Sequence, residues 1–189
     1  KPERSQDFDF ISELEFPLLG RTSFSLTYFN SHVKDIIIWQ RRFDGKFSPV
    51  NVSQASLSGW EQNFNWHTKN QILNLEFNHT LTEAINKSGL YPKDGKYLVF
   101  RPRHTYNLKL NFNPKPFSFN FSSHWVSQRY TREENTKFLQ AYKIMDLKIG
   151  LDSKWKKIGY QVSFGINNIT NQKYELIERY PMPGREYQA

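Results

Sequence analysis

Six arginines, arranged in pairs along the chain, are the side chains most able to bind a charged partner. A guanidinium group presents a planar fork of hydrogen-bond donors that matches carboxylates and phosphates. The chain has a net charge of +8, and Lys46, Lys93 and Lys137 lie close to the arginine pairs. This pattern predicts a surface that attracts anions, and a solvated basic surface without a ligand is the alternative. The six residues are Arg41, Arg42, Arg101, Arg103, Arg129 and Arg132.

The remaining polar residues form no pattern typical of an enzyme or a metal site. No histidine has a partner at the spacing of a helical metal site, and no loop has the dense Asp, Asn and Gly run of a calcium site. No nucleophile elbow and no phosphate-binding glycine-rich loop occur. The sequence therefore predicts no catalytic residue, no metal and no cofactor. We expect no nucleic-acid partner, because the basic residues are not interleaved with stacking aromatics on one face.

The segments around these arginines alternate apolar and polar residues with the period of two that is typical of β-strands. Tyr106, Leu108, Leu110 and Phe112, for example, alternate with polar neighbours. Aromatic residues make up 16% of the chain, although its mean hydropathy is −0.72. That combination favours a transmembrane β-barrel, in which only one face of each strand is apolar. We expect about eight antiparallel strands, at residues 6–16, 22–40, 50–66, 71–85, 97–112, 117–129, 138–151 and 158–169, with a ninth beginning at Arg185.

The breaks between these strands alternate between a short and a long class. The short breaks are residues 17–21, 67–71, 113–116 and 152–157, and the long ones are 41–49, 86–96, 129–137 and 170–184. Bacterial outer-membrane barrels have tight periplasmic turns at one rim and longer extracellular loops at the other. Aromatic residues near both kinds of break predict two interfacial girdles. In a soluble β-sandwich binding module, the alternative fold, the same aromatics would be core residues at strand ends.

The end of the chain has a more specific pattern. A strand leads into the asparagine-rich turn at residues 167–171, and a Pro-x-Pro-Gly-Arg-x-Tyr segment follows at residues 181–187. This arrangement resembles the C-terminal end of TonB-dependent outer-membrane receptors, as do shorter pieces at residues 1–5, 49–52 and 100–104. We expect an architectural role for the motif, since Asn tolerates turn geometry and Pro cannot donate to a strand ladder. Its residues are Asn167, Asn168, Pro181, Pro183, Gly184, Arg185 and Tyr187.

The resemblance implies an all-β, antiparallel, up-and-down transmembrane barrel of 22 strands, with a plug domain inside it. Residues 1–189 would supply about the last third of that barrel, without the plug and the remaining strands. Its partners would be those missing parts, TonB through the missing N-terminal part, and outer-membrane lipid and lipopolysaccharide. The implied function is active import, across the bacterial outer membrane, of a scarce ligand such as a ferric siderophore, cobalamin, haem or an oligosaccharide. A non-transporting outer-membrane scaffold or surface-assembly component built on the same barrel is the alternative.

Overall fold

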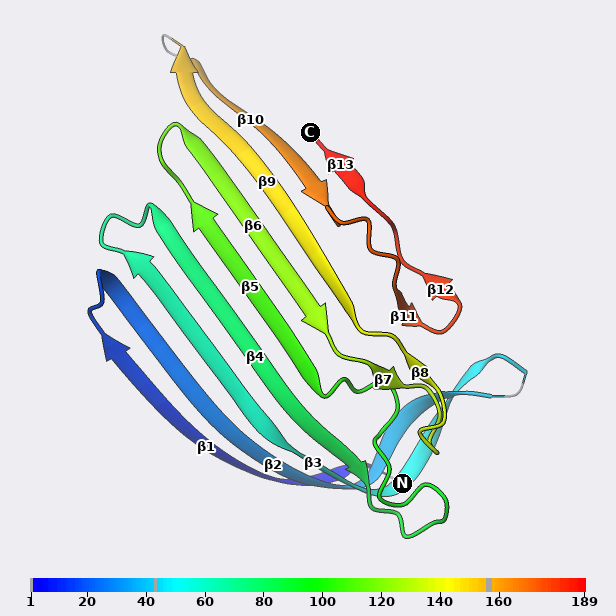
Figure 1. The fold of residues 1–189 in the computed structure, drawn as a ribbon. Helices are drawn as coiled ribbons and strands as arrows, with labels where there is room; N and C mark the ends of the chain where they lie inside the picture. The colour runs from blue at the N-terminus through cyan, green and yellow to red at the C-terminus, as the bar shows by residue number, and fades with distance from the viewer. Residues whose placement is uncertain (1, 43, 156–157) are drawn as a thin grey trace.

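The computed structural model describes residues 2–42, 44–155 and 158–189. Nine of the strands form one curved antiparallel sheet in the order β1-β2-β3-β4-β5-β6-β9-β10-β13, in which sequential long strands are neighbours (Figure 1). This arrangement confirms the up-and-down topology expected from the alternating pattern. The strands of the sheet are β1 (Arg4–Phe16), β2 (Gly20–Arg41), β3 (Phe47–Thr68), β4 (Leu73–Asn86), β5 (His104–Phe112), β6 (Phe117–Val126), β9 (Tyr142–Trp155), β10 (Ile158–Asn167) and β13 (Glu186–Gln188).

Two short hairpins lie outside this sheet, at the end where the long connections gather. One joins β7 (Arg129–Tyr130) to β8 (Phe138–Leu139), and the other joins β11 (Glu175–Ile177) to β12 (Tyr180–Pro181). In Figure 1 the short turns between consecutive long strands lie at the opposite end of the sheet. No helix among the described residues is long and apolar enough to cross a membrane.

Several strand ends differ from those expected. The strand expected at residues 97–112 begins only at His104, because Phe100 has a left-handed φ of 57° and Pro102 has no amide to give to a ladder. Conversely, β2 continues to Arg41 and β3 begins at Phe47, so the connection between them is shorter than the loop expected at residues 41–49. The expected break at 152–157 is also shorter, since β9 continues to Trp155, and residues 156–157 lie outside the described part.

The strand register gathers the apolar side chains on one face of the sheet. Phe24 on β2 pairs with Leu14 on one side and Phe64 on the other, and the same row continues to Phe77 and Leu108. No second sheet covers this face among the described residues, and Leu14 is 59% exposed. A wide uncovered apolar face suits a lipid environment, whereas a sandwich would bury it against a partner sheet.

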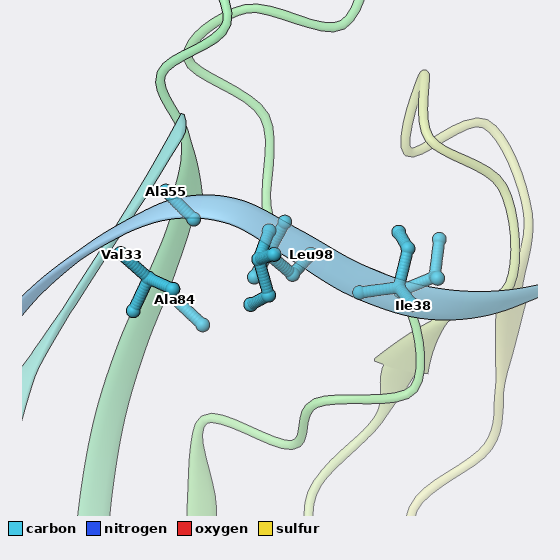
Figure 2. Close-up of a cluster of buried hydrophobic side chains, with 7 residues drawn as sticks. Val33, Ile38, Ala55, Ala84 and Leu98 are labelled. Atoms are coloured by element: carbon cyan, nitrogen blue, oxygen red, sulfur yellow. The ribbon is translucent and has the colours of Figure 1, made fainter. Parts of the chain in front are cut away.

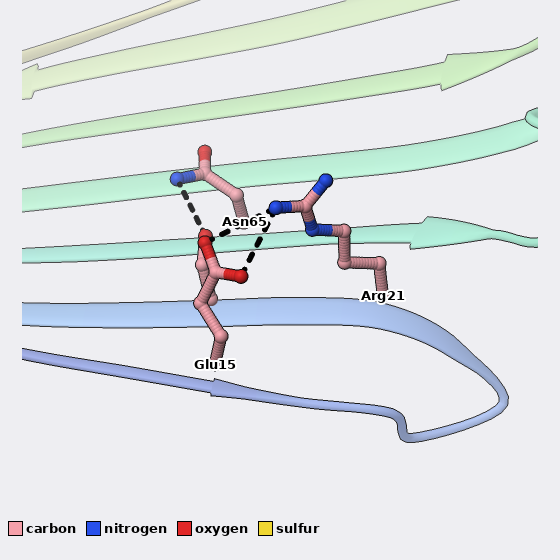
Figure 3. Close-up of polar contacts among 4 residues, drawn as sticks. Glu15, Arg21 and Asn65 are labelled. Carbon is pink, nitrogen blue, oxygen red and sulfur yellow. Dashed lines mark hydrogen bonds and ion pairs between the residues drawn. The ribbon is translucent and has the colours of Figure 1, made fainter.

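The opposite face is polar and its side chains bond to one another. The Asn78 Nδ2 donates to the Asn63 Oδ1 at 2.6 Å, and the Asn63 Nδ2 donates to the Ser25 Oγ at 3.1 Å. Near the short turns, the Arg21 guanidinium meets the Glu15 carboxylate at 3.0 Å (Figure 3). This face has the hydrogen-bonding character expected of the wall of an aqueous lumen.

A small hydrophobic core lies at the long-connection end (Figure 2). It forms where the segment after β4 folds back and lays Leu98 and Val99 over the extended parts of β2 to β4. Asp35, with a left-handed φ of 57°, interrupts the alternation of β2, a geometry that Asp tolerates better than most residues. The core side chains are Val33, Ile36, Ile38, Ala55, Ala84, Leu98 and Val99.

Candidate functional site

The connection between β4 and β5 is held against the connection between β6 and β9. The side chain of Asn135 bonds both backbone groups of Tyr97: its Oδ1 accepts from the Tyr97 N at 2.8 Å, and its Nδ2 donates to the Tyr97 O at 2.9 Å. The Phe100 amide donates to the Tyr130 carbonyl at 2.8 Å, and Lys93 forms an ion pair with Glu133. These contacts, together with a single antiparallel bridge between Tyr97 and Ile85 of β4, fix residues 97–100 in place.

The same β6–β9 connection holds the C-terminal segment through Arg129. This residue is only 5% exposed, and its Nη2 donates to the Glu175 carbonyl at 2.6 Å. Its guanidinium lies 5.3 Å from the ring of Tyr142, which packs on Tyr174 with the ring centroids 4.5 Å apart. Burial lowers the pKa of the Arg129 guanidinium below its ordinary value, and the Tyr142 hydroxyl opposes that shift. The β11–β12 hairpin is therefore anchored at its first residue.

Where these connections meet the tip of the β2–β3 hairpin, they leave an open groove of about 510 Å³. Three segments line it: the two strands of the hairpin, residues 99–101, and Leu176 with Ile177 of β11. The rings of Phe47 and Phe100, which both line the groove, lie 6.3 Å apart. The described residues of its lining are apolar except for Arg101, so its chemistry suits a ligand with an apolar body and a negative group.

A family model described as "TonB dependent receptor-like, beta-barrel" matches residues 1–169. This chain belongs to the TonB-dependent receptor family. The "Vitamin B12 transporter BtuB" of Photobacterium profundum is 24% identical over 193 residues, which cover 100% of this chain and 30% of that protein. The chain thus spans less than a third of the length of this curated relative.

Solved structures of this receptor family have the same fold. The ferric citrate transporter FecA in its unliganded form superposes with a TM-score of 0.77 at 14% identity, covering 98% of this chain and 30% of FecA. BauA, the ferric preacinetobactin receptor of Acinetobacter baumannii, gives a TM-score of 0.72 at 17% identity, covering 98% of this chain and 28% of BauA. At these identities the likeness concerns the fold alone, and it agrees with the sheet being a part of a barrel.

The six arginines singled out from the sequence of this receptor segment lie in different surroundings. Arg42 and Arg132 are exposed in turns, and the side chain of Arg41 lies outside the described part. Arg103 bonds Glu83 at 2.7 Å and lies 5.2 Å from the ring of Tyr97. Arg129 is buried, which leaves its side chain no surface for a ligand. Among the five of these arginines whose side chains the structure describes, Arg101 alone lines the groove.

The terminal motif of the receptor segment forms a compact turn. Asn168, buried with a left-handed φ of 51°, accepts from the Gln172 amide at 2.8 Å and donates to the carbonyls of Gln172 and Pro183 at 3.0 and 3.5 Å. Its own amide donates to the Asp146 carboxylate at 2.8 Å. The Asn171 Oδ1 accepts from the Arg185 amide at 3.0 Å.

The rest of the motif directs the chain back to the sheet. Pro181 belongs to β12, opposite Glu175. A β-carbon on Gly184 would lie 2.7 Å from the Asn171 Oδ1, so the side chain that bonds the Arg185 amide lies tightly against this glycine. Asn167 and its neighbour Ile166 then pair with β13, where Ile166 lies opposite Tyr187.

The fold brings two of the histidines together in a way that the sequence does not reveal. Within residues 2–42, 44–155 and 158–189, no three His, Cys, Asp or Glu side chains are close enough together to hold a metal ion. The His79 Nε2 and His104 Nδ1 lie 3.2 Å apart on neighbouring strands, and both rings stack with Tyr106.

Sequence reasoning missed the apolar residues of the groove. Ile37 and Trp39 lie in the strand expected at residues 22–40. Phe47 lies in the break expected at residues 41–49, and Leu176 and Ile177 lie in the one expected at residues 170–184. Two adjacent aliphatic residues inside a charged loop are a signal of burial or binding that could have been used.

Proposed function

We propose that the protein containing this chain is an outer-membrane importer energised through TonB, and that residues 1–189 form about the last third of its barrel wall. The observation that carries the proposal is the family match over residues 1–169, together with the single curved sheet of nine strands that has one apolar and one polar face. The chain is proposed to act in transport and not in catalysis.

The two faces of the sheet support an orientation in the membrane. The apolar face meets lipid, and the polar face lines a lumen that holds a plug domain. Exposed aromatic residues beside the short turns, such as Phe112 and Phe117, suit the periplasmic interface. The three longest connections, residues 87–103, 127–141 and 168–185, are extracellular in this orientation, which places the groove at the outer surface. The remaining barrel strands complete the wall.

The cargo is proposed to be a scarce ligand that porins cannot supply, in the range of a ferric siderophore, cobalamin, haem or an oligosaccharide. The exposed guanidinium groups of Arg42, Arg101 and Arg132 at the long-connection end support the attraction of anionic cargo. The same charges suit contact with lipopolysaccharide phosphates at the outer leaflet.

Uptake measured in cells tests this proposal. A strain lacking the gene is compared with its complemented parent, each with and without functional TonB, using ⁵⁵Fe-chelates and ⁵⁷Co-cobalamin as cargo. We expect uptake of one cargo to require both the gene and TonB. Uptake that needs neither one, for every cargo in the set, would contradict import and favour the non-transporting scaffold. The short connection between β2, which ends at Arg41, and β3, which begins at Phe47, supports that alternative.

A further inference from the structure

We infer that the groove between the β2–β3 hairpin tip, residues 99–101 and β11 binds a small organic anion. Its apolar or aromatic body lies in the groove, and its carboxylate, phosphate or sulfonate pairs with Arg101. This inference rests on the proposed import function, because it specifies the chemistry of the molecule that the outer surface captures.

The first argument is the exposure of apolar side chains around the groove. Trp39 is 62% exposed, Ile37 49%, and Leu176 and Ile177 42% and 41%. They belong to two segments far apart in the sequence, and all four line the same hollow. When an apolar ligand displaces the water between apolar residues of one concave site, the removal of apolar surface from water stabilises the complex.

The second argument is that the groove is held in shape before a ligand arrives. Ile38 and Val99 line the groove and also belong to the hydrophobic core shown in Figure 2. Residues 97–100 are fixed by Asn135 and by the Tyr130 carbonyl, and β11 is fixed by Arg129. A preformed site binds more tightly because less conformational entropy is lost on binding.

The third argument is the state of Arg101, the one charged residue among the described residues that line the groove. Arg103, two residues away, has Glu83 as its partner, and Lys93 and Lys137 have Glu133 and Glu178. Among the residues that the structure describes, no ion pair involves Arg101. An unpaired guanidinium beside an apolar surface complements an anion with an apolar body. The guanidinium orients the anionic group through hydrogen bonds, and the apolar surface provides the contact area for the rest of the molecule.

The size of the groove suits a small molecule better than a protein partner. A volume of about 510 Å³ falls in the range of pockets for small molecules, roughly 300–1,000 Å³. A specific protein partner needs a much larger surface, on the order of 800 Å² from each side. A small anion therefore fits this groove better than a protein does.

The test uses the full-length receptor in nanodiscs of neutral lipid, with 1-naphthoate and its neutral analogue 1-naphthamide as probes. Saturation-transfer-difference NMR reports the dissociation constant of each probe. We expect saturable binding of both, with naphthoate the tighter. Arg101→Gln should weaken naphthoate by at least about tenfold, as for the loss of one charge-assisted hydrogen bond, and leave naphthamide unchanged. Trp39→Ala and Ile177→Asn should weaken both probes.

Two control variants make the outcome specific. Arg103→Gln removes a nearby charge outside the groove, and Leu90→Asn removes an exposed apolar residue of the same loop end; neither should change binding. Absence of saturable binding, or an Arg101→Gln result equal to that of Arg103→Gln, would overturn the inference. Uptake in cells is measured separately. TonB-dependent uptake without probe binding would refute anion binding in the groove but not the proposed import. Probe binding without uptake would refute the proposed import but not anion binding in the groove.

Discussion

The side chain of Asn135 takes the place of a strand neighbour for Tyr97, since one amide group satisfies both the N–H and the C=O of that residue, at 2.8 and 2.9 Å. Asn135 itself has a left-handed φ of 57°, which Asn tolerates. This one contact joins two loops through residues that are 38 positions apart in the sequence, and it holds one wall of the groove.

Asn135→Gly should therefore loosen residues 97–100. Glycine accepts the left-handed backbone, so the change adds no strain. It removes both side-chain hydrogen bonds to Tyr97 and the 3.3 Å bond from the Asn135 Nδ2 to the Arg132 carbonyl. We expect a loss of about 1–3 kcal/mol in local stability, seen as faster hydrogen exchange at Tyr97 and its neighbours. Thr136→Ala, at the adjacent exposed position, is the control. Equal exchange rates in wild type and Asn135→Gly would show that other contacts hold the segment.

The two faces of β5 should respond differently to charge. Leu110→Arg places a cation on the apolar face and should cost about 2–4 kcal/mol if it lies near the bilayer midplane. Asn111→Arg, one residue along and on the polar face, should cost much less. The measurement is the free energy of unfolding of the full-length receptor in lipid vesicles. Equal costs would contradict the assignment of lipid and lumen faces.

Loop topology can be read on intact cells. Single cysteines at Ser88 and Thr136, in two long connections, should react with a membrane-impermeant maleimide, because these connections are proposed to be extracellular. A cysteine at Lys115, in the short β5–β6 turn, should react only after the outer membrane is permeabilised. The reverse labelling pattern would invert the proposed orientation.

The terminal turn should depend strongly on Asn168. Asn168→Ala removes hydrogen bonds to Gln172 and Pro183 and places alanine at a left-handed φ of 51°. Together these losses should destabilise the receptor by about 2–4 kcal/mol, measured as a lower unfolding midpoint in urea. Asn168→Gly restores the backbone freedom and should recover part of the loss. Asn167→Ala, one residue earlier and part of the sheet, serves as the comparison; an equal effect there would refute a special role for Asn168.

The alternation of residues such as Tyr106 to Phe112 was enough to predict most of the strands, their antiparallel order and their two faces. Side chains in a strand point alternately to opposite sides, so a sheet with one apolar and one polar face requires apolar and polar residues to alternate in the sequence. The terminal motif predicted the family for the same reason, because turn-forming Asn, Pro and Gly are local signals. Failures of the strand prediction occurred where long-range packing overrides local pattern, as at residues 97–103, where Leu98 and Val99 leave the sheet to cover the core.

The candidate site depended on tertiary structure. Six arginines look alike in the sequence, but folding buries Arg129, pairs Arg103 with Glu83, and brings Arg101 to a groove with Trp39 and Ile177. The sequence by itself determined the strands, the apolar and polar faces and the family, since each follows from periodicity or local turn chemistry. Only the tertiary structure decided which charge stays unpaired and which apolar residues converge, because both depend on contacts between segments that lie far apart along the chain.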